Sequence, residues 1–223
     1  MRLCVIPARG GSKRIPRKNI KEFCGKPMIA YSIEAAIKSG CFDKIVVSTD
    51  DEEIAQIAKS YGAEVPFMRP KELSDDHTAT IPVIAHAIEA SVYNINEVEA
   101  VCCIYATAPF VQARYIQEAY EKLLRCKTLY CFSATSFPFP IQRAIRLTKE
   151  DRVEMFSPEH FNTRSQDLEE AYQDAGQFYW TNLNKKSTKI MFSEDSIPII
   201  IPRHFVQDID TQEDWTRAEF MYE

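Results

Sequence analysis

The sequence predicts an α/β fold, in which helices flank a mainly parallel, Rossmann-like sheet and one arm is inserted late in the chain. Short apolar runs alternate with amphipathic stretches through the first 136 residues, as in a sheet that is covered on both sides. This alternation breaks after Ser136 and resumes near residue 176. A chain of 223 residues suits one compact domain, here expected to span residues 1–223.

The expected elements follow one another in a regular order. Residues 2–7 (RLCVIP) form the first strand, and residues 26–40 form a helix with Pro27 in its first turn and Gly40 past its end. Up to the arm, we further expect strands at 43–49, 64–68, 99–105 and 128–135 and helices at 50–62, 80–93 and 113–126. After the arm, strands are expected at 176–182 and 196–201, and a closing helix at 211–222.

Residues 137–165 are predicted to form the inserted arm, because prolines, aromatic residues and charges occur there without a βα pattern. Apolar side chains in so irregular a segment need cover, which a second subunit would supply. They are Phe137, Phe139, Ile141, Ile145 and Phe156. The arm therefore favours a homodimer.

Composition excludes several classes of protein. With 27 Lys and Arg against 32 Asp and Glu, the net charge of −5 argues against general binding to nucleic acid or to a membrane surface. The sequence has neither the pattern of a signal peptide nor an apolar run that could span a bilayer, so we expect a cytoplasmic protein. The seven cysteines show no zinc or redox spacing.

The stretch IPARGGSKRIPRKN, residues 6–19, gathers five cations around a glycine pair directly after the first strand. The glycines allow a tight turn whose N–H groups face an anion such as a triphosphate, while Arg9 and Lys13 supply charge. The carboxyl end of a parallel strand is where open α/β folds bind ligands. The alternative is a solvated charged face with a glycine turn. Neither the Walker loop nor the dinucleotide fingerprint matches.

Other polar residues have a structural interpretation beside the functional one. Arg69 ends an expected strand and is either a ligand contact or a surface residue ahead of Pro70. Thr80 precedes Ile81 and Pro82, which is also a good arrangement for a helix N-cap. Asp50 and Asp51 are expected to cap the helix that follows them.

The stretch DIDTQED, residues 208–214, combines a helix cap with an acidic pair. Thr211 and Asp214 have the spacing of a capping box, which leaves Asp208 without a structural role. In an extended segment, Asp208 and Asp210 point the same way and Ile209 points to the opposite face. Two hard carboxylate ligands of this kind suit a Mg²⁺ that keeps several waters and binds phosphates.

The stretch IPARGGSKRIPRKNI resembles the opening signature of the acylneuraminate cytidylyltransferases, which activate nine-carbon acidic sugars. Further stretches are similar to that family in order: VVSTDDEEIAQIAKSYGAEVPFMRPKELSDDHTAT, TRSQDLEEAY, AGQFYW and DIDTQED. The resemblance covers essentially the whole chain. It implies transfer of a cytidylyl group from CTP to a sugar, dependence on Mg²⁺, and a dimer joined through the arm.

The resemblance also implies roles for individual residues. Arg9 and Lys13 would act on the CTP phosphates in catalysis, and Asp208 and Asp210 would hold the metal. The nucleotide-binding residues would be Ala8, Gly10, Gly11, Ser12, Asn19, Arg69, Thr78 and Thr80, and the sugar-binding residues Tyr105, Arg164, Gln166, Tyr172 and Gln177. No side chain stands out as a general base.

Two departures favour the pseudaminic acid branch of the family. YATAP stands where N-acetylneuraminate enzymes carry Gln-Pro-Thr-Ser-Pro, which places Tyr105 at the glutamine, and Gln177 replaces a small apolar residue. The structural alternative is that Tyr105 merely ends a core strand and that Gln177 faces solvent. Another acidic sugar, such as N-acetylneuraminate or legionaminate, remains an alternative substrate. A catalytically silent nucleotide-binding regulatory protein is an alternative of a different class.

Overall fold

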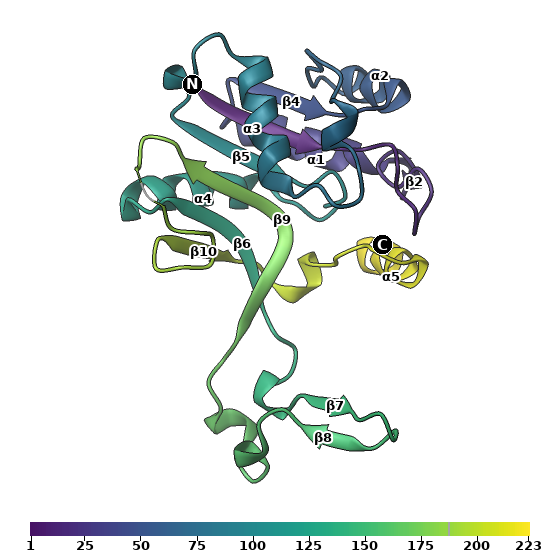
Figure 1. Cartoon of the computed structure of the whole chain (residues 1–223), viewed down its shortest axis with the longest axis vertical. Coiled ribbons are helices and arrows are strands. Elements are labelled where there is room, and N and C mark those ends of the chain that lie inside the picture. Colours follow the sequence, from purple (N-terminus) through teal and green to yellow (C-terminus); the bar gives the residue numbers. More distant parts are fainter. Residues whose placement is uncertain (187) are drawn as a thin grey trace.

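The structure is a computed structural model that describes residues 1–186 and 188–223. Its centre is a six-stranded sheet in the order β10-β6-β9-β5-β1-β4 (Figure 1). The strands are β1 (Arg2–Pro7), β4 (Lys44–Ser48), β5 (Ala100–Ile104), β6 (Tyr130–Ser136), β9 (Tyr172–Asn182) and β10 (Ser196–Ile200). Only β9 runs antiparallel to its neighbours β5 and β6, so the mainly parallel sheet is confirmed.

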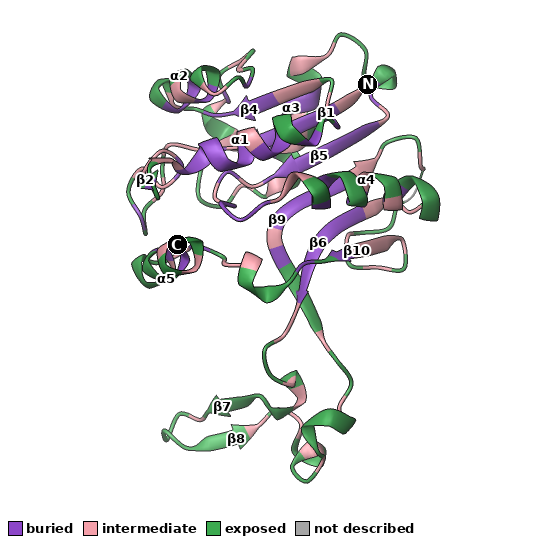
Figure 2. Cartoon of the chain, turned by 180° about the vertical axis from the view of Figure 1, so that it is seen from behind, coloured by how far each residue is buried: buried purple, intermediate pink, exposed green. Residues whose placement is uncertain are grey.

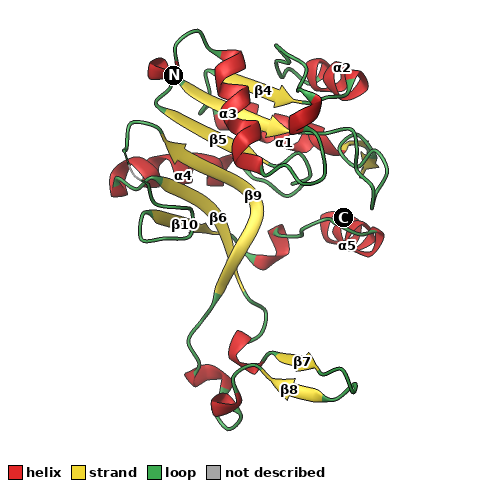
Figure 3. Ribbon diagram, viewed as in Figure 1, coloured by secondary structure: helices red, strands yellow, loops and turns green. Residues whose placement is uncertain are grey.

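Helices cover both faces of this sheet (Figure 3). They are α1 (Met28–Ser39), α2 (Glu52–Ser60), α3 (Thr80–Ser91) and α4 (Ala113–Cys126). The fifth helix, α5 (Gln212–Tyr222), lies to one side of the sheet. Buried side chains of α1, α2 and α4 share one hydrophobic core, and those of α3 belong to another on the opposite face. None of the helices in the described part of the chain is both long enough and apolar enough to cross a membrane.

Minor elements connect the layers. A short hairpin pairs β2 (Glu22–Phe23) with β3 (Lys26–Pro27). Single 3₁₀ turns lie at Lys71–Leu73, Ile95–Glu97, Ile141–Arg143, Pro158–His160, Ser165–Asp167 and Arg203–Phe205.

The strand expected at 64–68 is wrong. Only Glu64 bridges to Val46, and the chain then leaves the sheet. Pro66 has no N–H to donate to a ladder, which disfavours a strand at that point. The backbone N–H of Arg69 instead donates to the Thr49 carbonyl at 2.7 Å, a short hydrogen bond. The segment therefore returns to the end of β4.

The centre of the sheet is sealed from water. All five residues of β5 are buried, and Figure 2 shows β5 and the middle of β9 as buried between the helices. On β9, the buried Trp180 stacks on Phe42 with ring centroids 5.0 Å apart, and its indole N–H donates to the Ile116 carbonyl at 3.1 Å. This packing fixes α4 against the sheet.

A second, aromatic cluster attaches α5. The buried Phe23 ring makes edge-to-face contacts with Tyr31, Trp215 and Tyr222, at centroid distances of 5.6, 5.5 and 5.5 Å. The capping box at Thr211 begins α5 as the sequence predicted. Phe23 thereby holds α5, and the segment just before it, beside the β2–β3 hairpin.

The arm spans residues 137–171 and projects away from the layers, below the sheet in Figure 1. It ends later than the expected boundary of 165, because β9 begins at Tyr172. It also contains a hairpin that the irregular pattern did not predict, formed by β7 (Ile145–Leu147) and β8 (Val153–Met155).

The β7–β8 hairpin is amphipathic. Its register places Ile145 opposite Met155 and Leu147 opposite Val153, so these four side chains share one face. The other face carries the ion pair between Arg146 Nε and Glu154 Oε2, at 3.0 Å. On the apolar face Leu147 is 68% exposed and Val153 is 64% exposed. In the single chain this face is uncovered, in agreement with the sequence-based expectation that the arm needs cover.

We expect Phe23→Ala to lower the free energy of unfolding by about 3–5 kcal/mol, because truncation leaves a cavity where four aromatic rings meet. Urea denaturation measures the change. Tyr93→Ala serves as the control, since Tyr93 lies fully in solvent and should change stability by less than about 0.5 kcal/mol. Equal effects of the two substitutions would contradict the anchoring role of Phe23.

Candidate functional site

A cavity of about 420 Å³ lies where β1 and β5 end. This is the carboxyl edge of the parallel strands, the place where open α/β sheets bind ligands. It is lined by Pro7, Arg9, Ser12, Arg14, Lys18, Asn19, Arg69, Thr78, Thr80, Val83, Tyr105, Ala106, Thr107 and Asp210. Eight of the predicted site residues are in this set: Arg9, Ser12, Asn19, Arg69, Thr78, Thr80, Tyr105 and Asp210.

The loop of residues 8–19, here called the cation loop, is held by backbone-directed hydrogen bonds. The buried Ala8 donates its N–H to the Ser48 carbonyl at 2.9 Å, which continues the pairing of β1 with β4. The buried Asn19 donates its side-chain amide to the Arg9 carbonyl at 2.8 Å. The loop is therefore closed across its two ends, and its long cationic side chains are left to face outward.

The glycine pair acts differently from the prediction. Neither Gly10 nor Gly11 has a positive φ. The Gly10 N–H is engaged by Asp50 Oδ1 at 2.9 Å, so it is not free to meet an anion. A Cβ on Gly10 would lie 2.7 Å from Asp51 Oδ2, whereas a Cβ on Gly11 would meet nothing within 4 Å. Glycine is thus required at position 10 for the close approach of Asp51.

Carboxylates from elsewhere in the chain meet the cations of the loop. Arg9 Nη1 lies 2.6 Å from Asp76 Oδ1, and Lys13 pairs with the other oxygen of the same carboxylate. Arg14 Nη2 lies 2.9 Å from Asp210 Oδ1, and Lys18 Nζ lies 3.4 Å from the same oxygen. The carboxylate of Asp76, 67 positions from Arg9, and that of Asp210, 192 positions from Lys18, therefore balance part of the charge of the cation loop.

Arg69 forms the buried wall of the cavity. Its side chain donates to Ser48 Oγ at 3.0 Å and also to the Ser48 carbonyl, and the residue is only 6% exposed. Burial lowers the pKa of Arg69 from its usual value. It has no ion pair with a carboxylate of the described residues, so its charge favours an anion in the cavity. This position agrees with a binding role and not with a surface residue.

Four cations (Arg9, Arg14, Lys18 and Arg69) but only one carboxylate (Asp210) line the cavity among the residues that the structure describes. A ligand that carries several negative charges balances this arrangement. The local positive charge lies on a chain whose net charge is −5.

Asp208 lies next to the cavity-lining Asp210. The intervening Ile209 is fully buried in the aromatic cluster under α5, as the predicted alternation requires. Removal from water, followed by the negative charge of Asp210, raises the pKa of Asp208. Within residues 1–186 and 188–223, no group of three or more His, Cys, Asp or Glu side chains forms a complete metal cage. The pair is suited to an ion that receives its other ligands from water or from a phosphate.

Of the two caps predicted for α2, one is confirmed and one is wrong, and the N-cap alternative for Thr80 is also wrong. Asp51 caps α2 by accepting from the Glu53 and Ile54 N–H groups. Asp50 is not a cap, because its carboxylate holds Gly10. The N-cap of α3 is Ala79, and Thr80 is the first residue of that helix. Thr80 is therefore available to the cavity that it lines.

Tyr105 follows β5 and lines the cavity, so it does more than end a core strand. Burial raises the pKa of its hydroxyl, which lies close to Thr80 and Tyr179. Gln177 is only 3% exposed, so the solvent-facing alternative is wrong. Its amide donates to the Phe205 carbonyl at 2.5 Å, and its side-chain oxygen is buried without a partner in the described residues. Gln177 does not line the cavity, but its carbonyl accepts from the Tyr105 N–H at 2.9 Å.

The remaining predicted sugar residues lie outside the cavity of their own chain. Arg164 and Gln166 belong to the arm, and Tyr172 begins β9 at the base of the arm, where its hydroxyl donates to Glu170 at 2.7 Å. None of the three lines the cavity.

Sequence reasoning left Arg14, Lys18 and Thr107 without a site role, although all three line the cavity. The signal for the first two was present, because they belong to the same basic run as Arg9 and Lys13. Thr107 lies in the loop three residues after β5, and loop residues commonly bind ligands.

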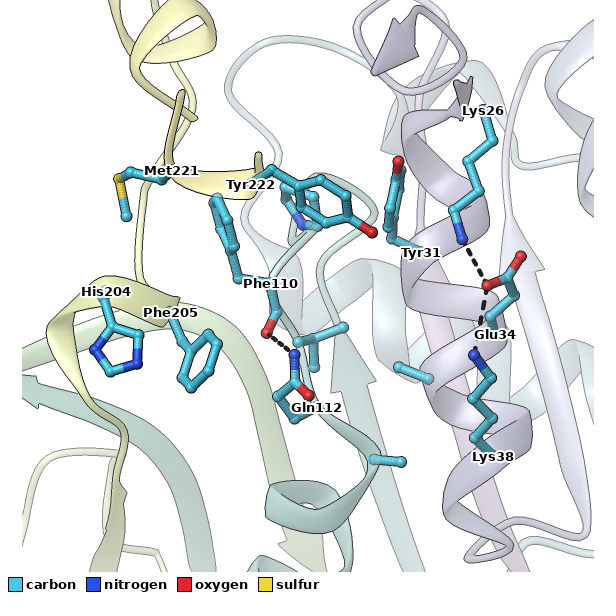
Figure 4. A pocket seen from close by; sticks show the side chains of 14 residues that line it. Lys26, Tyr31, Glu34, Lys38, Phe110, Gln112, His204, Phe205, Met221 and Tyr222 are labelled. Carbon is cyan, nitrogen blue, oxygen red and sulfur yellow. Dashed lines mark hydrogen bonds and ion pairs between the residues drawn. The ribbon is translucent and has the colours of Figure 1, made fainter. Parts of the chain in front are cut away.

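A second hollow, of about 380 Å³, lies between α1, residues 109–113, residues 204–205 and α5 (Figure 4). One wall is aromatic, with Phe110 and Tyr222, and the other carries Glu34 between two lysines. Glu34 Oε2 lies 2.6 Å from Lys26 Nζ and 3.8 Å from Lys38 Nζ. One carboxylate faces two lysines in this hollow, against one carboxylate and four cations in the cavity at β1, so the hollow has less unbalanced charge.

The fold and the cavity together define an α/β protein with a cation-lined cavity at the carboxyl edge of its sheet. Comparison with known families is more specific. The chain belongs to the cytidylyltransferase family, whose model matches residues 3–214, and it is therefore a nucleotidyltransferase enzyme.

Relatives extend this relationship over the full chain. A pseudaminic acid cytidylyltransferase of Campylobacter jejuni strain 81-176 is 48% identical, over 99% of this chain and 95% of its own length. A CMP-N,N'-diacetyllegionaminic acid synthase of Legionella pneumophila is 32% identical, over 99% and 96%. The solved structure of a CMP:2-keto-3-deoxy-manno-octonic acid synthetase complexed with CTP has the same fold, with a TM-score of 0.71, 15% identity and 99% and 98% coverage.

Gly10→Ala is expected to lower the free energy of unfolding by about 1–3 kcal/mol, since the added methyl group overlaps the Asp51 carboxylate and forces the loop to shift. Gly11→Ala is the matched control and should change stability by less than about 1 kcal/mol, in the stabilising direction if at all. Urea denaturation of both variants checks the contrast. If Gly11→Ala proved the more damaging substitution, the close approach at Gly10 would not be the constraint.

Proposed function

We propose that this chain transfers the CMP group of CTP to the anomeric hydroxyl of a nonulosonic acid, most specifically pseudaminic acid, and releases pyrophosphate. The observation that carries the proposal is full-length identity of 48% to a pseudaminic acid cytidylyltransferase, together with the cation-lined cavity in the place that the fold reserves for a ligand.

The cavity supports placement of the triphosphate beside the cation loop. Arg9, Ser12 and Lys13 would contact phosphate oxygens, since they lie on the part of the loop that follows β1. Asn19, Arg69, Thr78 and Thr80 would hold the nucleoside from the opposite walls. Ala8, Gly10 and Gly11 would contribute through the backbone path of the loop, which Ser48 and Asp50 fix.

In the reaction, the hydroxyl oxygen of the sugar bonds to the α-phosphorus of CTP. The bond between this phosphorus and the oxygen that bridges the α- and β-phosphates breaks. Pyrophosphate takes the electron pair of that bond, and the sugar hydroxyl loses its proton. The residues of this chain would accelerate the step by orienting the two substrates and by neutralising phosphate charge through Arg9 and Lys13. The described lining residues include no histidine that could act as a general base.

Mg²⁺ fits the donor set at the mouth of the cavity. Asp208 and Asp210 offer hard carboxylate oxygens on either side of the buried Ile209. Arg14 and Lys18 now pair with Asp210, and a divalent cation would replace these two ion pairs. When bound there, Mg²⁺ would supply charge neutralisation at the phosphates.

Tyr105 and Gln177 would determine sugar specificity. Tyr105 presents a partly buried ring and one hydroxyl to the cavity. The unpaired side-chain oxygen of Gln177 is a buried acceptor next to the same strand end, behind the residues that line the cavity, and a substrate N–H that reached it would find an unpaired partner. Pseudaminic acid carries an additional acylated nitrogen, which distinguishes it from N-acetylneuraminate.

The arm supports a homodimer. Its hairpin has an apolar face without cover in the single chain, where Leu147 and Val153 are mostly exposed. A partner subunit would cover that face and could bring Arg164, Gln166 and Tyr172 to the sugar end of the other cavity. As partners we therefore propose CTP, an acidic nine-carbon sugar and a second copy of the chain, in the cytoplasm.

The function is tested by pyrophosphate release from CTP and Mg²⁺ with either pseudaminic acid or N-acetylneuraminate. We expect kcat/KM to be about ten-fold or more higher for pseudaminic acid, because a site with a buried unpaired polar group rejects an analogue that lacks its partner. Gln177→Ala should narrow the gap, and chelation of Mg²⁺ should abolish release. Equal efficiency with both sugars would overturn the substrate assignment, and no release with any acidic sugar would favour the silent regulatory protein.

The dimer is tested by substituting the apolar face of the hairpin. Leu147→Asp combined with Val153→Asp should convert a dimer into a monomer at micromolar concentration, because two charges would be buried without partners. Light scattering measures the mass. Lys149→Asp, at the exposed tip of the same hairpin, should leave the dimer intact. A monomeric wild-type chain at this concentration would contradict the proposal.

A further inference from the structure

The acidic turn, residues 75–78, lies against the cation loop. Asp76 Oδ1 accepts from Arg9 Nη1 at 2.6 Å, and the other Asp76 oxygen pairs with Lys13. Arg9 Nη1 also donates to the Asp75 carbonyl, at 2.9 Å. These two cations are the ones assigned above to the phosphates, and in the structure a single carboxylate bridges them.

The neighbouring carboxylate of Asp75 has a different task. It accepts from the His77 N–H at 3.0 Å, from the Thr78 N–H at 2.7 Å and from Thr78 Oγ1 at 2.6 Å. Asp75 therefore builds the turn itself. The polar contacts of Asp76 within the described residues are only with Arg9 and Lys13. Pairing first with Lys13 and then with Arg9 lowers the pKa of Asp76 to about 2, so this carboxylate is charged at neutral pH.

The turn is firmly attached only at its base. Ser74 Oγ donates to the Pro70 carbonyl at 2.9 Å, and Arg69 Nη1 donates to the Leu73 carbonyl at 3.4 Å. Beyond Ser74, Asp76 is tied to the cation loop by two ion pairs that solvent reaches: its side chain is 31% exposed, and those of Arg9 and Lys13 are 33% and 79% exposed. Exposed pairs of this kind contribute little to stability and exchange readily.

We propose that Asp76 is a positioning residue that occupies the phosphate position between Arg9 and Lys13 in the free enzyme and competes there with the nucleotide. This inference rests on the proposed function. One carboxylate and one phosphate group cannot both occupy the space between the same two donors. The incoming triphosphate must displace Asp76, and Asp76 can return as pyrophosphate leaves.

The competition has two consequences. In the free enzyme, Asp76 keeps two long cationic side chains in the geometry that a phosphate needs, which reduces the ordering required on binding. During turnover, it lowers the affinity for the pyrophosphate part of the ligand, which favours product release. The cost of displacement falls on ligands with phosphates at Arg9 and Lys13, and not on the nucleoside.

The test compares binding of inorganic pyrophosphate and of CMP by calorimetry at fixed Mg²⁺, without sugar. Asp76→Asn keeps the size of the side chain but removes its charge. We expect its Kd for pyrophosphate to fall about ten-fold, because the phosphate no longer competes with a charged carboxylate. The Kd for CMP should stay unchanged. In the steady state, KM for CTP should fall while kcat does not rise.

Asp75→Asn is the matched control, because it removes the same charge one residue away and disturbs only the turn. It should not tighten pyrophosphate binding. In a Lys13→Ala background, the effect of Asp76→Asn should shrink, since one of the two contested donors is gone. Asp76→Glu, which retains the charge, should keep an affinity close to that of the wild type.

Unchanged or weaker pyrophosphate binding by Asp76→Asn would overturn the inference, as would equal tightening by Asp75→Asn, which would reflect net charge alone. Asp76→Ala provides a second neutral variant if Asp76→Asn does not fold, and the same outcomes apply to it. A wild-type chain that binds neither CTP nor pyrophosphate would overturn the proposed function together with the inference. If the chain binds CTP but substitution of Asp76 leaves this binding unchanged, only the inference is overturned.

Discussion

Neutralisation of the cation loop is the constraint on which the rest of the site depends. The loop brings five cations together within ten residues, and such a concentration of charge is unstable without counter-charges. Three carboxylates supply them. Asp51, at the start of α2, pairs with one of these cations, and Asp76 in the acidic turn and Asp210 before α5 pair with two each. Three segments that are remote in sequence therefore converge on one loop, and two of them contribute to the lining of the cavity, through Thr78 and Asp210.

Apolar packing makes this convergence possible at the C-terminal side. Ile209 is buried between two acidic residues, and Trp215 packs on Phe23. Lys18 also donates to the Ile209 carbonyl at 2.6 Å, so the same short segment is fixed through its backbone as well as its side chains. Asp210 thereby reaches the cavity from the far end of the chain. The aromatic cluster under α5 is thus part of the support of the site, although it lies outside the cavity.

Local patterns in the sequence predicted the six strands of the sheet and the covering helices, although they added a strand at 64–68, because periodicity and glycine positions follow from short-range physics. They could not identify the partners of the cations. The residues around Asp50 favour a helix cap. In the fold, however, the Asp50 carboxylate accepts from the N–H of Gly10, which follows a neighbouring strand. Likewise, the requirement for glycine at position 10 comes from Asp51, and contacts of that kind are determined only by the fold. The sequence also did not predict the β7–β8 hairpin, because strands of only three residues are too short to show a clear alternation.

Two features of the arm, its exposed apolar face and the position of its predicted sugar-binding residues, would both be explained by a second copy of the chain. The single chain leaves the apolar face of the hairpin in solvent, and it leaves Arg164 and Gln166 away from the cavity that the resemblance assigns to them. The β6–β9 pairing extends to Ser136 and Tyr172, so the arm leaves the sheet at these two residues. A second copy that covered the hairpin would leave this pairing intact. We therefore propose that the projecting arm is shared between two chains, an arrangement that leaves the long β9 strand, which carries Gln177, intact.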